Sequence, residues 1–307
     1  MKITYLCYSF FVAMAISITE NTLTDAARWN LLQKKAQEVR AVRAFDLFRK
    51  HKIEPILIKG LSAGRFYPDD RPRMSIDMDL AVSAKDFDAA SEIAASGDAN
   101  GLAIDLHREL RHHDTAGWDD LFENSEILEF DTGSIRVLRP EDNLRVLCIH
   151  WLTDGGSNKD RLWDVFYSIQ NRHTDFDWDR FLSVVSPNRR RWLICTVGLA
   201  HKYLGLDLTG TPVETDALDL PDWLTKTVER EWASKTKAIP LEVTLNDPKM
   251  FLTQAVKRLR PNPIWATVQM EGSFDAKTRV FYQIGNAVSR IIPSSKRITQ
   301  TLRQNSK

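Results

Sequence analysis

Hydrophobic residues recur at helical spacing in the first long segment of the chain. Between residues 25 and 50 they stand three or four positions apart among many Lys, Arg and Glu residues: Leu32, Ala36, Val39 and Val42. A helix with one packed face and one wet face has this pattern. The sequence therefore predicts a long amphipathic helix over Asp25 to about Lys50, with these four residues on its packed face.

Two segments that follow have the pattern of strands. The β-branched run Ile56-Leu57-Ile58 ends in Lys59-Gly60, which is typical of a strand followed by a turn. In Ile76-Asp77-Met78-Asp79-Leu80, hydrophobic and acidic residues alternate strictly. Because successive side chains of a strand point to opposite faces, the hydrophobic residues are predicted to face the core and both aspartates the other side.

Further strands are expected downstream. The segment 102–107 alternates so that Asp105 and His107 point outward, and a third alternating segment covers 134–138, before Pro140 opens a helix. Residues 83–95 are helical in pattern. The region therefore reads as strands with helices covering one face, an α+β arrangement.

After Pro140 the pattern becomes entirely helical. One stripe contains Leu144, Leu147, Cys148, Trp151 and Leu152, and similar stripes follow. We therefore expect four parts: an apolar helix or signal segment over 1–24, a mixed core over 25–139, a helical domain over 140–245, and an irregular segment over 246–307. The last part ends in a basic tail with Arg297, Arg303 and Lys307, which is expected to be solvated.

Composition limits the possible partners. Lys and Arg number 42 against 41 Asp and Glu, a formal net charge of +1 without the basic excess that general nucleic-acid binding needs. Cys7, Cys148 and Cys195 are too far apart in sequence to suggest a disulfide framework or a thiolate zinc site. The apolar stretch 3–12 is too short to span a bilayer comfortably, so no membrane partner is expected.

The paired aspartates suggest metal chemistry. Carboxylates at positions i and i+2 of a strand point the same way, about 7 Å apart along the chain. Asp77 and Asp79 could share a divalent cation, and Asp105 on a neighbouring strand could supply a third carboxylate. Such hard oxygen ligands suit Mg²⁺, with Mn²⁺ as the alternative, in a site for phosphoryl chemistry. By spacing alone, a solvated acidic strand edge explains the pair equally well.

Several motifs in order carry a more specific resemblance. They are Ile58-Lys59-Gly60, Phe66-Tyr67-Pro68, Arg73-x-Ser75-x-Asp77-x-Asp79-Leu80, Ile104-Asp105-Leu106-His107, Leu138-Arg139-Pro140-Glu141-Asp142, Cys148-Ile149-His150-Trp151 and Arg161-Leu162-Trp163-Asp164-Val165. Together they resemble the uncharacterised bacterial nucleotidyltransferase family of the polymerase-beta-like superfamily, over roughly residues 25 to 205.

The resemblance implies a minimal nucleotidyltransferase core, a short mixed sheet flanked by helices, followed by a helical domain that closes the cleft. It also implies that Asp77, Asp79 and Asp105 ligate the metal ions and carry the catalysis. Lys59 and Gly60 stand where better-known relatives have a Gly-Ser phosphate-binding turn, and a lysine there could serve as a point charge or be only a strand-end residue.

Two residues of the following loop are further candidates for substrate binding. Arg73 could reach a triphosphate or pair with Asp69 or Asp70. Ser75 is equally explained as a ligand or a turn former. His107 could touch the substrate, although a structural histidine is favoured.

The predicted function is metal-dependent transfer of a nucleoside monophosphate from a nucleoside triphosphate, ATP among them, to an unidentified hydroxyl or phosphate acceptor, with release of pyrophosphate. The acceptor could be a small molecule, a sugar or a protein. The alternative is a nucleotide-binding or regulatory module of the same fold with little turnover, associated with a toxin–antitoxin or polysaccharide system.

A nucleotide-using enzyme is expected in the cytoplasm, so we favour a first helix over a signal peptide for the N-terminal segment. Export is the alternative, with a mature N-terminus after Ala15.

Overall fold

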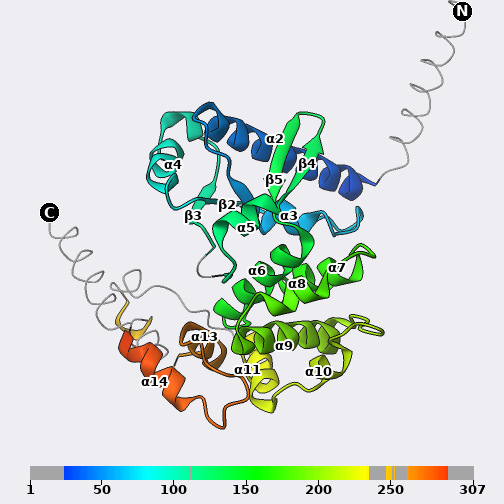
Figure 1. Ribbon diagram of the computed structural model, residues 1–307, viewed down its shortest axis with the longest axis vertical. Coiled ribbons are helices and arrows are strands. Elements are labelled where there is room, and N and C mark those ends of the chain that lie inside the picture. The colour runs from blue at the N-terminus through cyan, green and yellow to red at the C-terminus, as the bar shows by residue number, and fades with distance from the viewer. Residues whose placement is uncertain (1–23, 111–112, 235–246, 251, 253–260, 290–307) are drawn as a thin grey trace, which may run out of the picture. The chain divides into compact units, whose positions relative to one another are not determined.

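The computed structural model describes residues 24–110, 113–234, 247–250, 252 and 261–289 (Figure 1). Residues 1–23 of the predicted N-terminal segment lie outside the described residues, as do Arg297, Arg303 and Lys307 of the predicted tail. The chain divides into two compact units, which are described separately: unit 1 comprises residues 1–109 and 125–137, and unit 2 comprises 110–124 and 138–307. Residues 110–124, which fall inside the predicted core range 25–139, thus group with the second unit.

Unit 1 is built on a mixed five-stranded sheet. Its strands are β1 (Ile56–Ile58), β2 (Met78–Val82), β3 (Ile104–Arg108), β4 (Glu126–Phe130) and β5 (Gly133–Val137). Their order across the sheet is β3-β2-β1-β5-β4. β2 runs parallel to β3 and antiparallel to β1, while β5 runs parallel to β1 and antiparallel to β4.

Helix α2 (Asp25–Lys50) contacts strand β5, and helix α4 (Phe87–Ala94) contacts strand β3 (Figure 1). The two helices also contact each other. The first turn of α2 is capped by Thr24, whose hydroxyl accepts a hydrogen bond from the Ala27 N–H. The hydrophobic core beneath the helices joins helix and strand residues, among them Val42, Phe45, Phe48, Leu57, Leu80, Val82, Ile135 and Val137.

The bounds predicted for the long helix are confirmed, but the residues predicted for its packed face are mostly wrong. Val42 is buried, whereas Leu32, Ala36 and Val39 are exposed. The buried hydrophobic residues of α2 begin at Ala41, so the half of the helix that packs on the sheet is the C-terminal half. Spacing alone could not show where along the helix the packing begins.

The strand containing the paired aspartates begins later than predicted. Pairing with the neighbouring strand starts at Met78, opposite Ile104. Ile76, predicted to face the core, precedes the strand and is 86% exposed, so that prediction is wrong. Met78 and Leu80 do pack against the core as predicted.

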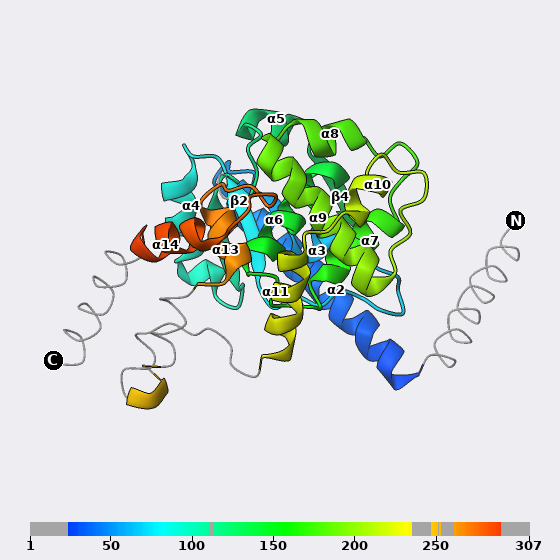
Figure 2. The ribbon, with the colours of Figure 1, turned by 90° about the horizontal axis from the view of Figure 1, so that it is seen from below.

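Unit 2 is helical in its described residues. The elements are α5 (Trp118–Glu123), α6 (Pro140–Thr153), α7 (Leu162–Gln170), α8 (Trp178–Ser183), α9 (Pro187–Leu204), α10 (Glu214–Leu218), α11 (Asp222–Ala233), α13 (Pro263–Gln269) and α14 (Val280–Ser289) (Figure 2). The mixed sheet followed by a helical region confirms the predicted α+β class. The prediction of irregular structure from residue 246 is wrong at α13 and α14, which are only 7 and 10 residues long and so show little periodicity in the sequence.

Local sequence signals account for the helix ends of unit 2. Pro140 and Pro187 occupy the first turns of α6 and α9, where a missing N–H costs no helical hydrogen bond. Gly205 ends α9 in the left-handed conformation at φ 76°. No described helix is long and apolar enough to cross a bilayer.

Candidate functional site

The acidic side chains of β2 and β3 lie on one face of the sheet. In the parallel pairing of these strands, Asp79 stands opposite Asp105, and Ala81 opposite His107. Side chains of paired residues point to the same face, as do those of residues two apart on a strand. Asp79, Asp105 and His107 therefore share a face, and Leu80 points the other way, into the core under α2.

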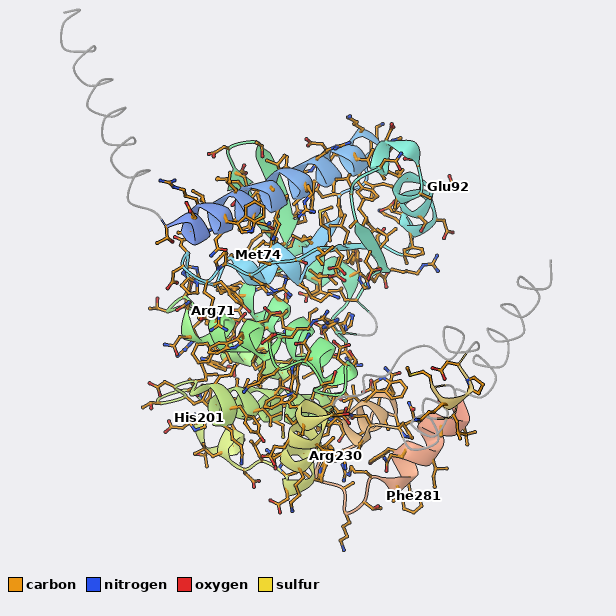
Figure 3. All side chains as sticks on the ribbon, turned by 180° about the vertical axis from the view of Figure 1, so that it is seen from behind. Arg71, Met74, Glu92, His201, Arg230 and Phe281 are labelled. Atoms are coloured by element: carbon orange, nitrogen blue, oxygen red, sulfur yellow. The ribbon has the colours of Figure 1, made fainter. Side chains whose placement is uncertain are left out.

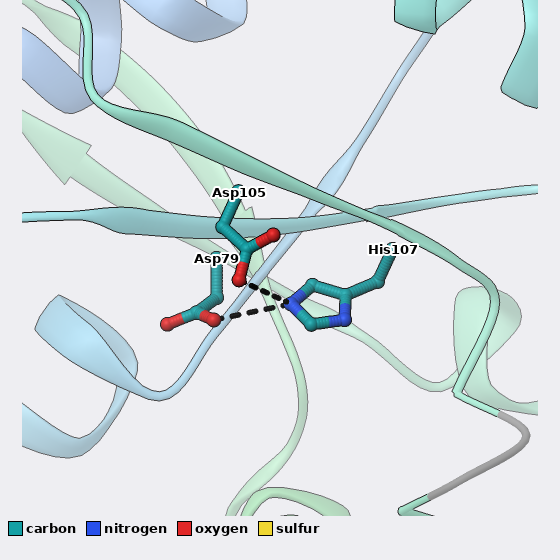
Figure 4. Close-up of side chains that lie close together, drawn as sticks. All are labelled: Asp79, Asp105 and His107. Carbon is teal, nitrogen blue, oxygen red and sulfur yellow. Dashed lines mark hydrogen bonds and ion pairs between the residues drawn. The ribbon is translucent and has the colours of Figure 1, made fainter. Parts of the chain in front are cut away.

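The three side chains converge closely enough to share a ligand (Figure 4). His107 Nε2 lies 3.1 Å from Asp79 Oδ1 and 3.5 Å from Asp105 Oδ2. One potential ligand atom from each residue lies within 4.8 Å of the others. The predicted convergence of Asp79 with Asp105 from adjacent strands is thus observed, with His107 between them.

Burial differs sharply between the two carboxylates. The Asp79 side chain is 9% exposed, and that of Asp105 is 61% exposed. Asp79 is therefore the buried carboxylate of the group, while Asp105 is accessible from solvent.

The ammonium of Lys59 forms an ion pair with the buried carboxylate of Asp79. Its Nζ lies 2.5 Å from Asp79 Oδ1, and both side chains are buried. Burial by itself raises the pKa of Asp79, but the hydrogen bond from His107 and the charge of Lys59 outweigh it and lower the pKa to about 2. Asp79 is therefore ionised throughout the neutral range.

The turn after β1 gives Lys59 this position. Lys59 has φ 57° and ψ −137°, an uncommon conformation for a residue with a side chain, and Gly60 follows with φ 37°. Such a backbone costs on the order of 1–3 kcal/mol at a non-glycine residue. The buried ion pair with Asp79 is the contact that accompanies this strained turn.

Three of the predicted site residues meet in a small cavity of about 20 Å³, roughly the space of one water molecule. Gly60, Ser75 and Asp77 line it, together with residues of α2. A Cβ placed on Gly60 would lie 3.8 Å from Ser75 Oγ, so the turn and the loop before β2 approach closely.

Asp77 is not part of the group formed by Asp79, Asp105 and His107. It precedes β2, is exposed, and accepts hydrogen bonds from the Ser75 hydroxyl at its carbonyl oxygen (2.8 Å) and at Oδ1 (3.3 Å). Ser75 therefore shapes the loop that carries Asp77. The role of Asp77 as a metal ligand stays a prediction.

Arg73 lies beside α3 (Gly60–Gly64), where a Cβ placed on Gly64 would lie 3.6 Å from its Cβ. Of the two loop aspartates considered as its partners, Asp69 forms an ion pair of 2.7 Å with Lys34. Binding of a triphosphate by Arg73 stays a prediction.

His107 is within hydrogen-bond distance of Asp79, which agrees with the structural histidine that the sequence favoured. Its place two residues after Asp105 on an alternating strand already put both side chains on one face. The contact with Asp79 itself was not predicted, because spacing could not show that β3 pairs with β2 in the register that sets His107 beside Asp79.

The donor set suits a divalent cation. Two carboxylates and an imidazole are ligands that divalent metals accept, and oxygen-rich sets favour Mg²⁺ or Mn²⁺. The ammonium of Lys59 already stands at Asp79 Oδ1, which shows that this atom is placed to receive positive charge. An ion bound through that atom would compete with Lys59.

Comparison with known proteins gives one match. A family model described as an uncharacterised nucleotidyltransferase matches residues 13–205, more than half of the chain. The matched range contains Lys59, Asp77, Asp79, Asp105 and His107. No curated protein and no solved structure matches the chain.

Proposed function

The chain belongs to the family of uncharacterised nucleotidyltransferases, and from that premise we propose that it transfers a nucleoside monophosphate from a nucleoside triphosphate to a hydroxyl or phosphate acceptor. The bond between the α- and β-phosphates breaks, a bond from the acceptor oxygen to the α-phosphorus forms, and pyrophosphate leaves. An acceptor hydroxyl loses its proton in the process.

The observation that carries this proposal is the register of β2 against β3. It sets Asp79 opposite Asp105, so that two carboxylates from different strands meet on one face of the sheet. A single acidic strand edge would not bring together groups so far apart in sequence. Phosphoryl transfer depends on such converging charges, because the protein's main task is to position and neutralise the phosphates.

Asp79 and Asp105 are proposed to hold Mg²⁺, or Mn²⁺, with Asp77 as a further ligand from the loop before β2. The bound ion would neutralise the triphosphate and orient its oxygens. His107 lies within hydrogen-bond distance of Asp79 and can fix the orientation of that carboxylate.

Asp105 is the proposed general base. It is the more exposed of the two carboxylates, so an acceptor hydroxyl can approach it, whereas Asp79 is buried against Lys59. A general base must reach the proton that it removes, so the exposed Asp105 suits this role better than the buried Asp79.

Lys59, Gly60, Arg73 and Ser75 are proposed to bind the phosphates. Gly60 follows Lys59 and begins α3, and Ser75 lies beside Gly60. With Asp79 holding a metal ion, the ammonium of Lys59 would be available to a phosphate oxygen as a point charge.

The test is a transfer assay with purified protein, each α-labelled nucleoside triphosphate, Mg²⁺ or Mn²⁺, and a panel of sugars, small hydroxyl compounds and proteins as acceptors. We expect a labelled product with at least one acceptor, and its loss in Asp105→Asn. Asp98→Asn, an exposed aspartate outside the group, serves as the control. Absence of metal-dependent labelling across the panel would contradict turnover.

A nucleotide-binding module with little turnover is the second candidate, and the ion pair of Lys59 with Asp79 favours it. A lysine that occupies a metal-ligand oxygen weakens metal binding. Calorimetry with nucleotide and Mg²⁺, beside the transfer assay, distinguishes the two: binding without a labelled product supports the module.

We further propose that the protein acts in the cytoplasm, where nucleoside triphosphates are available. Mass spectrometry of the protein isolated from its cells tests this, because a mature N-terminus after Ala15 would indicate export.

A further inference from the structure

Helix α14 turns its hydrophobic residues toward solvent. The side chains exposed on it are Val280, Phe281, Ile284 and Val288, with Phe281 76% exposed (Figure 3). At 3.6 residues per turn these four positions fall on one stripe of the helix. An amphipathic helix on a folded protein normally turns such a stripe inward.

The opposite side of α14 makes polar contacts with the protein. The Tyr282 hydroxyl accepts a hydrogen bond from the Ser273 N–H, and Gln283 Nε2 donates one of 2.7 Å to the Pro261 carbonyl. Asn286 is buried. These contacts fix which side of the helix faces outward.

Packing against α13 fixes the helix as well. A Cβ placed on Gly285 would lie 2.9 Å from Met270 Cε, so the helix approaches the Met270 side chain closely at this glycine. Figure 2 shows α13 and α14 side by side, and the two helices are in contact. The contacts on the opposite side of α14 therefore orient the apolar stripe toward solvent, so its four residues form a patch and are not isolated exposed residues.

Positive charge accompanies the stripe in the sequence. Residues 276–307 contain seven Lys and Arg and no Asp or Glu, whereas the preceding residues carry 35 Lys and Arg against 41 Asp and Glu. Of these seven, Arg279 is buried, and the five from residue 290 onward lie outside the described residues. Among the described residues, exposed Lys277 precedes the start of α14 by three positions. An apolar stripe beside concentrated positive charge is the combination that binds anionic lipid surfaces.

We propose that α14 docks on an anionic lipid bilayer, with Val280, Phe281, Ile284 and Val288 inserted at the interface and with Lys277 and the basic residues that follow the helix in sequence attracted to acidic headgroups. A ten-residue helix is about 15 Å long, so it lies in the plane of the surface rather than across it. A second copy of the chain is the less favourable occupant, because it would bring two strongly basic segments together.

This inference goes beyond the transfer reaction and differs from the expectation of no membrane partner. That expectation rested on the absence of a long apolar segment, which is a criterion for spanning and not for surface binding.

The experiment is flotation of the full-length protein with vesicles of phosphatidylcholine alone and of phosphatidylcholine mixed with phosphatidylserine. We expect binding to the mixed vesicles only, weakened by added salt because screening reduces the headgroup attraction. The double substitution Phe281→Ser with Ile284→Ser should reduce binding roughly tenfold or more, since both the inserted residues and their apolar area are lost.

Leu218→Ser is the matched control, because Leu218 and Ile284 are each 57% exposed and Leu218 lies in α10. Circular dichroism of each variant checks folding. If the double variant loses helix, the variant Lys277→Glu replaces it in the test. Lys277→Glu should also weaken binding to the acidic vesicles. Equal binding to both kinds of vesicle, no binding to either, or unchanged binding by the double variant and by Lys277→Glu would overturn the proposal. A concentration-dependent dimer that the double variant abolishes would overturn it in favour of self-association.

Discussion

The ammonium of Lys59 lies 2.5 Å from Asp79 Oδ1, the same oxygen that His107 Nε2 approaches at 3.1 Å. A buried cation of the protein thus stands where a bound metal ion would have to make contact. This relationship gives Lys59 two opposing effects: it keeps Asp79 ionised, and it competes with any ion for that oxygen.

Replacing Lys59 with methionine separates these effects. Without added metal, Lys59→Met leaves Asp79 buried without its cation, so the free energy of unfolding should fall by about 3 kcal/mol. With Mn²⁺ or Mg²⁺, the melting temperature of the variant should rise more than that of the wild type, because the ion no longer displaces an ammonium. Thermal unfolding with and without metal measures both, and Lys85→Met at an exposed lysine is the control. Equal metal-induced shifts in variant and wild type would show that Lys59 and the ion do not compete.

Asp105→Asn provides the cleanest test of catalysis. Asp105 is 61% exposed, so the substitution should change stability by no more than about 0.5 kcal/mol. Loss of the carboxylate should nevertheless reduce transfer roughly 100-fold or more. Urea unfolding and the labelled-nucleotide assay are to be made on the same preparation, with Asp98→Asn beside it. Retained activity in Asp105→Asn would remove this residue from the mechanism.

Asp77→Asn tests the carboxylate that precedes β2. If Asp77 ligates the metal with Asp79, the variant should need a higher Mg²⁺ concentration and lose roughly 100-fold in transfer rate, with little change in stability at this exposed position. Asp70→Asn, exposed in the same loop, is the matched control. A Mg²⁺ titration of the transfer rate measures the effect. Identical titrations for wild type and Asp77→Asn would restrict the metal site to Asp79, Asp105 and His107.

The sequence predicted the elements better than their contacts. Alternation placed Asp79 on one face of a strand and Leu80 on the other, and both assignments hold. Alternation could not show where the strand starts, because the start is set by pairing with β3 from Met78 onward. For this reason the prediction that Ile76 faces the core is wrong. β4 (Glu126–Phe130) was not predicted because exposed Ile127 interrupts the alternation of its sequence, although Leu128 and Phe130 pack against the core.

The contact between Lys59 and Asp79 could not be predicted from the sequence, for a different reason. It depends on a positive φ at Lys59, which no pattern of residue types specifies at a non-glycine position. It also depends on the antiparallel register that pairs Ile58 with Asp79. Candidate residues could be chosen from motifs, but which of them touch is decided by turn geometry and strand order.

The lowered pKa of Asp79 predicts a pH dependence of stability. Its pKa is about 2 in the folded protein against an ordinary value of 3.8, so the ionised form stabilises the fold. That stabilisation, about 2 kcal/mol, is fully present above pH ~4 and is lost as the pH falls toward ~2. Urea unfolding across this range should show a steeper loss for the wild type than for Asp79→Asn. Parallel curves would mean that Asp79 does not interact with Lys59 and His107 as described.

A buried ionic cluster makes the stability of unit 2 sensitive to the loss of one of its partners. Arg145 donates hydrogen bonds to Asp114 (2.9 Å), to Asp142 (2.6 Å) and to the Arg180 carbonyl (2.7 Å), and the side chains of Arg145, Asp114 and Asp142 are completely buried. Asp142 keeps the Arg180 guanidinium when Arg145 is removed, but Asp114 loses its cation in the interior.

Arg145→Met should therefore lower the free energy of unfolding by about 3–5 kcal/mol, because removing one partner of a buried ion pair leaves the other uncompensated. Urea unfolding followed by tryptophan fluorescence measures the change, and Arg190→Met at an exposed arginine of α9 should stay within about 0.5 kcal/mol of the wild type. The double variant Arg145→Met with Asp114→Asn should recover part of the loss, since it removes the stranded charge together with its partner. A single variant as stable as the wild type would show that the cluster is solvated, and that the fold of unit 2 rests on its hydrophobic core alone.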